Sequence, residues 1–156
     1  MARRVFFSFH YERDVWRAGQ VRNSWVTKPD RESAGFWDAA KWEQVQRQGE
    51  DAVKQWIRNQ MSGTSVTAVL IGAETATRPY VQYEIQRSWD TKNGLFGIYI
   101  HNMKEVSGRT DVKGADPFAA KGWTGFKTYD WVHDGGYNQL ADWVEQAYAR
   151  IATRKY

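Results

Sequence analysis

One acidic side chain stands out in this sequence because a proline and a tyrosine fix its place on a helix. Pro79 suits the first turn of a helix, and Tyr80 and Glu84, four residues apart, then lie on one face. The apolar segment 64–71 before them predicts a buried strand. Ligands of open α/β sheets usually bind where the strands end, which is where the following helix begins. A carboxylate beside a flat ring at that place could stabilise positive charge on a ligand, so Glu84 is a candidate site residue.

The composition removes several competing chemistries. The chain has no cysteine, which excludes disulfides, thiol catalysis and thiolate metal sites. Its three histidines, His10, His101 and His133, are far apart, so we expect no metal site. The phosphate-binding motifs G-x-G-x-x-G and G-x-x-x-x-G-K-[ST] and the serine motif G-x-S-x-G are missing. The candidate site that remains is a single carboxylate among aromatic residues.

Length and charge indicate the class of protein. The 156 residues suit one domain, which we predict to span residues 1–156. The 22 basic and 18 acidic residues give a net charge of +4 without a long run of either sign, so we expect no nucleic-acid partner. No segment approaches the about 20 apolar residues that cross a bilayer, and residues 1–7 do not form a signal peptide. We therefore expect a soluble, cytoplasmic protein without membrane contact.

The apolar patterns predict alternating strands and helices. Strands are expected at 5–9, 64–71, 95–100 and 129–132, with an edge strand near Phe36 and Trp37. Helices are expected at 14–25, 42–60, from Pro79 through Trp89, and from Tyr137 to Ile151. Residues 101–127 have no firm assignment. This order indicates an α/β fold with a parallel sheet and helices on both faces.

The spacing within two helices also predicts which residues are buried. In helix 14–25 the expected buried positions are Val15, Ala18, Val21 and Trp25. In the helix from Pro79 they are Val81, Ile85 and Trp89. This phase leaves Tyr80 and Glu84 on a flank that faces the crevice.

Three segments resemble the bacterial TIR-like domains, specifically the TIR subunit of Thoeris anti-phage defence systems. They are RVFFSFH at 4–10, SVTAVLIG at 65–72 and RPYVQYEI at 78–85. The likeness spans nearly the whole chain and continues through 114–118, 129–132 and 136–138. It implies a flavodoxin-like, TIR-like fold with a central parallel sheet and helices on both faces.

The resemblance also implies an activity. TIR domains similar to this one use a glutamate, four residues after a tryptophan, to break the nicotinamide N-glycosidic bond of NAD. By position Glu84 is the catalytic glutamate, with Tyr80 in place of the tryptophan. The implied substrate-binding residues are Phe7, Ser8, Phe9, His10, Trp37, Asp38 and Tyr80. NAD is then the substrate, and no cofactor is expected.

The Thoeris likeness further implies partners. Phage infection would trigger the TIR subunit to make a cyclic ADP-ribose isomer, which activates a separate effector protein. The implied partners are therefore NAD, an effector reached through the signal molecule, a phage component as trigger, and further copies of this chain in a homo-oligomer.

Several alternatives stay open at this point. The chain could be a non-catalytic TIR adapter that acts through self-association and protein partners, or a nucleotide sensor without turnover. A nucleoside deoxyribosyltransferase has a related sheet and also uses a glutamate on an N-glycoside, but no further motif supports it. His10 could cap the end of its strand, Ser8 could bond the backbone of its loop, and Arg78 could bind phosphate or be solvated.

Overall fold

Five parallel strands form the centre of the computed structural model, which describes residues 3–26, 31–34 and 39–153. The strands are β1 (Arg3–Ser8), β2 (Arg31–Ala34), β3 (Val66–Ile71), β4 (Gly94–Tyr99) and β5 (Thr128–Asp130). Their order is β2-β1-β3-β4-β5, and every neighbouring pair is parallel. This is the flavodoxin-like strand order, so the predicted fold class is confirmed.

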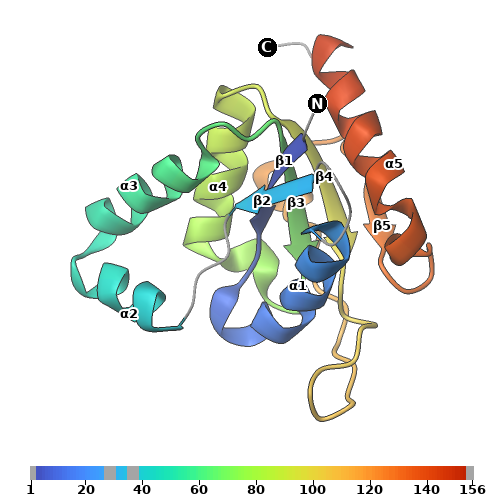
Figure 1. Cartoon of the computed structure of the whole chain (residues 1–156), viewed down its shortest axis with the longest axis horizontal. Helices are drawn as coiled ribbons and strands as arrows, with labels where there is room; N and C mark the ends of the chain where they lie inside the picture. The colour runs from blue at the N-terminus through green and yellow to red at the C-terminus, as the bar shows by residue number, and fades with distance from the viewer. Residues whose placement is uncertain (1–2, 27–30, 35–38, 154–156) are drawn as a thin grey trace.

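Helices cover both faces of this sheet (Figure 1). They are α1 (Tyr11–Val26), α2 (Ala39–Arg47), α3 (Glu50–Met61), α4 (Pro79–Asp90) and α5 (Gly136–Ala149), with short 3₁₀ helices at Thr75–Thr77, Ala119–Lys121 and Arg150–Thr153. One core joins the sheet to α1 and α5, and the cores on the other face join it to α2, α3 and α4. None of the helices in the described ranges is long and apolar enough to cross a membrane.

Successive side chains of β1 pack on opposite faces of the sheet. Val5 and Phe7 pack in the core with α1 and α5, while Phe6 packs against α2 and α3. Because side chains alternate along a strand, Ser8 points to the same face as Phe6. The last residue of β1 is thereby directed toward the helices of that face, among them α4.

The long helix predicted over 42–60 is wrong, because the chain forms two helices there. They are separated at Gln48 and Gly49. Gly49 has a φ of 100°, which residues other than glycine rarely adopt. The turn folds α2 back along α3, so that Trp42 and Ile57 lie in one apolar cluster. Hydrophobic spacing continues through the turn and conceals it in the sequence.

Other predictions differ from the structure in detail. The edge strand is β2 at Arg31–Ala34, and Phe36 and Trp37 lie outside the described residues. Val15 is 39% exposed, so it does not belong to the buried face of α1. Asp14 and Arg17 are buried in that part of α1 instead.

Residues 101–127 contain one 3₁₀ helix and no strand. They nevertheless contribute to the core, because Phe118 is fully buried and stacks on Phe126 at a ring-centroid distance of 4.8 Å. Trp89 packs against the same cluster and is only partly buried.

Two glycines offer a matched test of the packing of α5 on the sheet. A Cβ at Gly94 would lie 2.6 Å from the carbonyl oxygen of Ala147 in α5, whereas one at Gly19 in α1 meets no atom within 4 Å. We expect Gly94→Ala to lower the free energy of unfolding by about 1–3 kcal/mol. Gly19→Ala should raise it by roughly 0.5–1 kcal/mol, since alanine favours helix. Urea denaturation measures both, and an unchanged Gly94→Ala variant would contradict the close approach of α5.

Candidate active site

A pocket of about 360 Å³ lies at the carboxyl end of β1, beside the start of α4. It is lined by Phe7, Phe9, His10, Tyr11, Glu12, Trp42, Gln46, Glu50, Ile57, Arg78, Pro79, Tyr80, Val81 and Glu84. In the order β2-β1-β3-β4-β5, the chain leaves β1 toward one side and β3 toward the other. Ligands of open α/β sheets bind at such a switch point, so this pocket is the expected site.

The start of α4 sets the position of Glu84. The helix begins at Pro79, as predicted, and Arg78 before it is extended with φ −78° and ψ 122°, as the residue before a proline prefers. Val81 and Ile85 are buried in the core between α4 and the sheet. This phase brings Glu84 to the pocket wall with 7% of its surface exposed.

The carboxylate of Glu84 has a hydroxyl as partner and no cation. Ser8 donates a hydrogen bond from Oγ to Oε1 of Glu84 at 2.7 Å, in a buried environment. No lysine, arginine or histidine of the described residues forms an ion pair with Glu84. Burial raises the pKa of Glu84 to about 8, and the Ser8 hydroxyl lowers it in part. The group therefore titrates close to neutral pH, as catalytic carboxyls do.

Aromatic rings form a wall of this pocket. Trp42 lies between Tyr11, at a centroid distance of 5.7 Å, and Tyr80, at 6.1 Å and edge to face. The indole Nε1 of Trp42 donates to Oε1 of Glu12 at 3.0 Å, which fixes the ring. Flat ligand rings can stack on or against such a wall.

Two basic side chains border the pocket. His10 is 9% exposed, and its Nε2 lies 3.4 Å from Oε2 of Glu12. Burial, followed by the charge of Arg78, lowers the pKa of His10, so its imidazole is neutral at pH 7. Arg78 is the one arginine or lysine among the described residues that line the pocket.

The pocket contains most of the site residues predicted from the sequence. Phe7, Phe9, His10, Tyr80 and Glu84 line it together. Ser8 is not among the lining residues and contacts Glu84 instead. Trp37 and Asp38 lie outside the described residues.

Sequence reasoning missed the wall contributed by the α2–α3 hairpin. Trp42, Gln46, Glu50 and Ile57 reach the pocket because the chain turns at Gly49. Tyr11 and Glu12 were also missed, although they directly follow His10 and could have been added as neighbours of the predicted loop.

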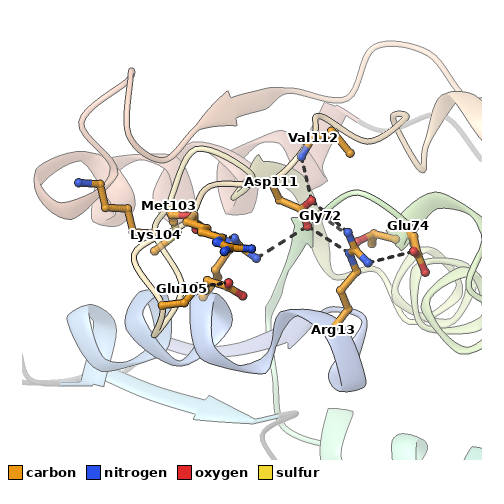
Figure 2. A network of polar contacts seen from close by, with 12 residues as sticks. Arg13, Gly72, Glu74, Met103, Lys104, Glu105, Asp111 and Val112 are labelled. Atoms are coloured by element: carbon orange, nitrogen blue, oxygen red, sulfur yellow. Dashed lines mark hydrogen bonds and ion pairs between the residues drawn. The ribbon is translucent and has the colours of Figure 1, made fainter.

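A polar network anchors the first turns of α1 (Figure 2). These turns supply Tyr11 and Glu12 to the pocket. Arg13 donates to both carboxylate oxygens of Asp111, at 3.0 and 3.1 Å, and to Glu74 at 3.1 Å. Arg17 donates to the backbone oxygen of Met103 at 2.8 Å. These contacts tie α1 to the loops after β3 and β4, at the same edge of the sheet as the pocket.

Comparisons with known proteins identify the family of this chain. A family model described as "Thoeris protein ThsB, TIR-like domain" matches residues 6–105, a range that includes every residue lining the pocket. A curated protein of Bacillus cereus (strain MSX-D12), named "Putative cyclic ADP-D-ribose synthase ThsB1", is 35% identical over 92% of this chain and 100% of that protein. Both findings agree with the likeness seen in the sequence.

The burial of Glu84 has a consequence for stability. Its pKa in the folded protein is about 8, above the ordinary 4.5, so ionisation is unfavourable in the folded state. The stabilisation of the folded state by the protonated Glu84 carboxyl is complete below pH 4.5. It is lost as the pH rises through 8. We expect Glu84→Gln to raise the melting temperature by roughly 3 °C or more at pH 9, relative to its effect at pH 5.

Thermal unfolding at the two pH values measures this difference. Glu43→Gln serves as the control, because the Glu43 side chain is 66% exposed and its charge is hydrated. A Glu84→Gln effect that is the same at pH 5 and pH 9 would contradict the raised pKa.

Proposed function

Since this chain belongs to the TIR-like domain family of Thoeris ThsB proteins, we propose that it breaks the nicotinamide N-glycosidic bond of NAD and makes a cyclic ADP-ribose-type product. The observation that carries this proposal is the buried carboxylate of Glu84 in the wall of an aromatic pocket. The name of the Bacillus cereus relative supports the type of product. NAD is the substrate in this proposal, and no cofactor takes part.

Glu84 acts on the ribose in this scheme. Nicotinamide in NAD carries a positive charge, so it leaves as a neutral molecule with the electron pair of the broken bond, and no general acid is needed. The ribose carbon then develops oxocarbenium character. An ionised carboxylate beside that carbon stabilises the charge, as in glycosidases. A cationic substrate also favours ionisation of a carboxyl whose pKa is about 8.

The pocket walls direct the second half of the reaction. The rings of Phe9, Tyr11, Trp42 and Tyr80 stack on the flat parts of NAD and exclude water. Without water, a nitrogen of the adenine or a ribose hydroxyl of the same molecule attacks the ribose carbon. The ring closes, and a hydroxyl that attacks passes its proton to a base such as the carboxylate of Glu84.

Arg78 is suited to the pyrophosphate of NAD. It carries the one guanidinium or ammonium group among the described lining residues. The acidic lining residues are Glu12, Glu50 and Glu84. Arg78 precedes the first turn of α4, whose backbone N–H groups point out of the helix and favour anions. His10 borders the same part of the pocket, and Trp37 and Asp38 stay predicted substrate contacts.

The family also supports a place in defence. We propose that the product activates a separate effector protein, that a phage component triggers the enzyme, and that the active form is a homo-oligomer. A non-catalytic adapter is the alternative, and it would not need the carboxylate of Glu84.

The first test replaces the carboxylate by an amide of the same shape. Glu84→Gln should lower nicotinamide release from NAD by about 10²–10³-fold, because it removes the charge that stabilises the transition state. Mass spectrometry of the reaction mixture measures nicotinamide and the cyclic product, with Glu43→Gln as the active control. If the parent chain releases no nicotinamide, even when concentrated or taken from phage-infected cells, the proposed NAD-cleaving activity is refuted.

The second test addresses Arg78. Arg78→Ala should raise the KM for NAD by roughly tenfold, because a charge-assisted hydrogen bond to phosphate is lost. Nicotinamide riboside lacks the phosphates, so its turnover should not change. Arg87→Ala, in the last turn of the same helix and away from the pocket, is the matched control. Equal losses with both substrates would show that Arg78 does not bind the pyrophosphate.

A further inference from the structure

We propose that Ser8 is a positioning residue for Glu84, whose hydroxyl holds one carboxylate oxygen so that the other oxygen is directed to the substrate. This inference rests on the proposed function of Glu84. It also changes the role expected for Ser8, which the resemblance placed among the residues that bind NAD directly.

The position of Ser8 prevents contact with a ligand. It is the last residue of β1, pairs with Val69 of β3, and has 0% of its surface exposed. The pocket is lined by Phe7 and Phe9 on either side of it, but not by Ser8 itself. What Ser8 reaches is Oε1 of Glu84, at 2.7 Å.

The contact leaves the two carboxylate oxygens of Glu84 in different surroundings. Oε1 is held by Ser8, whereas Oε2 accepts no hydrogen bond within the described part of the chain. Glu84 itself lines the pocket with 7% of its surface exposed, and Oε2 is the oxygen that we assign to the substrate. A carboxylate fixed in this way presents one oxygen to the ribose without reorganisation, which is the preorganisation that catalysis needs.

A serine hydroxyl suits this task in both protonation states. It can donate to an ionised carboxylate and accept from a protonated one, so the contact persists while Glu84 gains or loses a proton. Its use as a nucleophile is excluded by its burial and by its surroundings. In the described residues its hydroxyl donates to Glu84, and no histidine or lysine side chain forms a hydrogen bond with it.

The chain contains a second buried serine that makes a matched control. Ser88 is also 0% exposed, and its Oγ donates to the main-chain oxygen of Glu84 at 2.7 Å. It also bonds Thr67 of β3 at 2.7 Å. Ser88 therefore holds the helix at Glu84, whereas Ser8 holds the carboxylate.

The test compares Ser8→Ala, Ser8→Thr and Ser88→Ala. The titration of the Glu84 carboxyl is followed by carbon NMR on protein labelled at glutamate, with Glu84→Gln to assign the signal. We expect Ser8→Ala to raise the Glu84 midpoint by roughly one pH unit, because the ionised form loses its donor. Ser8→Thr, which keeps the hydroxyl, should restore the midpoint, and Ser88→Ala should leave it unchanged while lowering the melting temperature.

Activity gives the second readout. The rise of nicotinamide release with pH should move to higher pH in Ser8→Ala, with a lower kcat and a KM for NAD near that of the parent. An unchanged Glu84 midpoint in Ser8→Ala, or an equal shift in Ser88→Ala, would overturn the role of Ser8. A Ser8-dependent titration in a chain that never releases nicotinamide supports the contact and refutes the proposed function alone.

Discussion

The structure depends on one costly arrangement, a carboxyl buried in the wall of an aromatic pocket with a hydroxyl as its partner. Burial without a cation raises the pKa of Glu84 to about 8. Asp111, in contrast, forms an ion pair with Arg13, and its pKa is lowered. An acid left unpaired lowers stability at high pH, and such sites persist where the charge has a use.

The parallel fold is what brings the parts of this arrangement together. β1 lies beside β3, so the last side chain of β1 meets the helix that follows β3. The buried face of α4 fixes the rotation of that helix, and Ser88 and Thr67 tie it to the sheet. Trp42, from the α2–α3 hairpin, packs edge to face against Tyr80 in the pocket wall. β1, α4 and the α2–α3 hairpin each form part of the surroundings of the Glu84 carboxylate.

Local features made part of this predictable. Pro79 sets the start of α4 by its fixed φ, and the apolar run before it gives β3, so the place of Glu84 follows from short-range rules. The α2–α3 turn does not follow from them, because hydrophobic spacing continues through Gly49 and the turn depends on packing against the sheet. The contact between Ser8 and Glu84 joins residues 76 positions apart, which no local pattern can indicate.

The central claim is that the Glu84 carboxylate acts on the ribose that carries nicotinamide. A crystal structure of the chain with a non-cleavable carbocyclic analogue of NAD tests it most directly. The account predicts that Oε2 of Glu84 lies against the nicotinamide ribose while Oε1 keeps its bond to Ser8. An analogue bound with this ribose away from Glu84, or a pocket that does not bind the analogue in any assembled form, would contradict it.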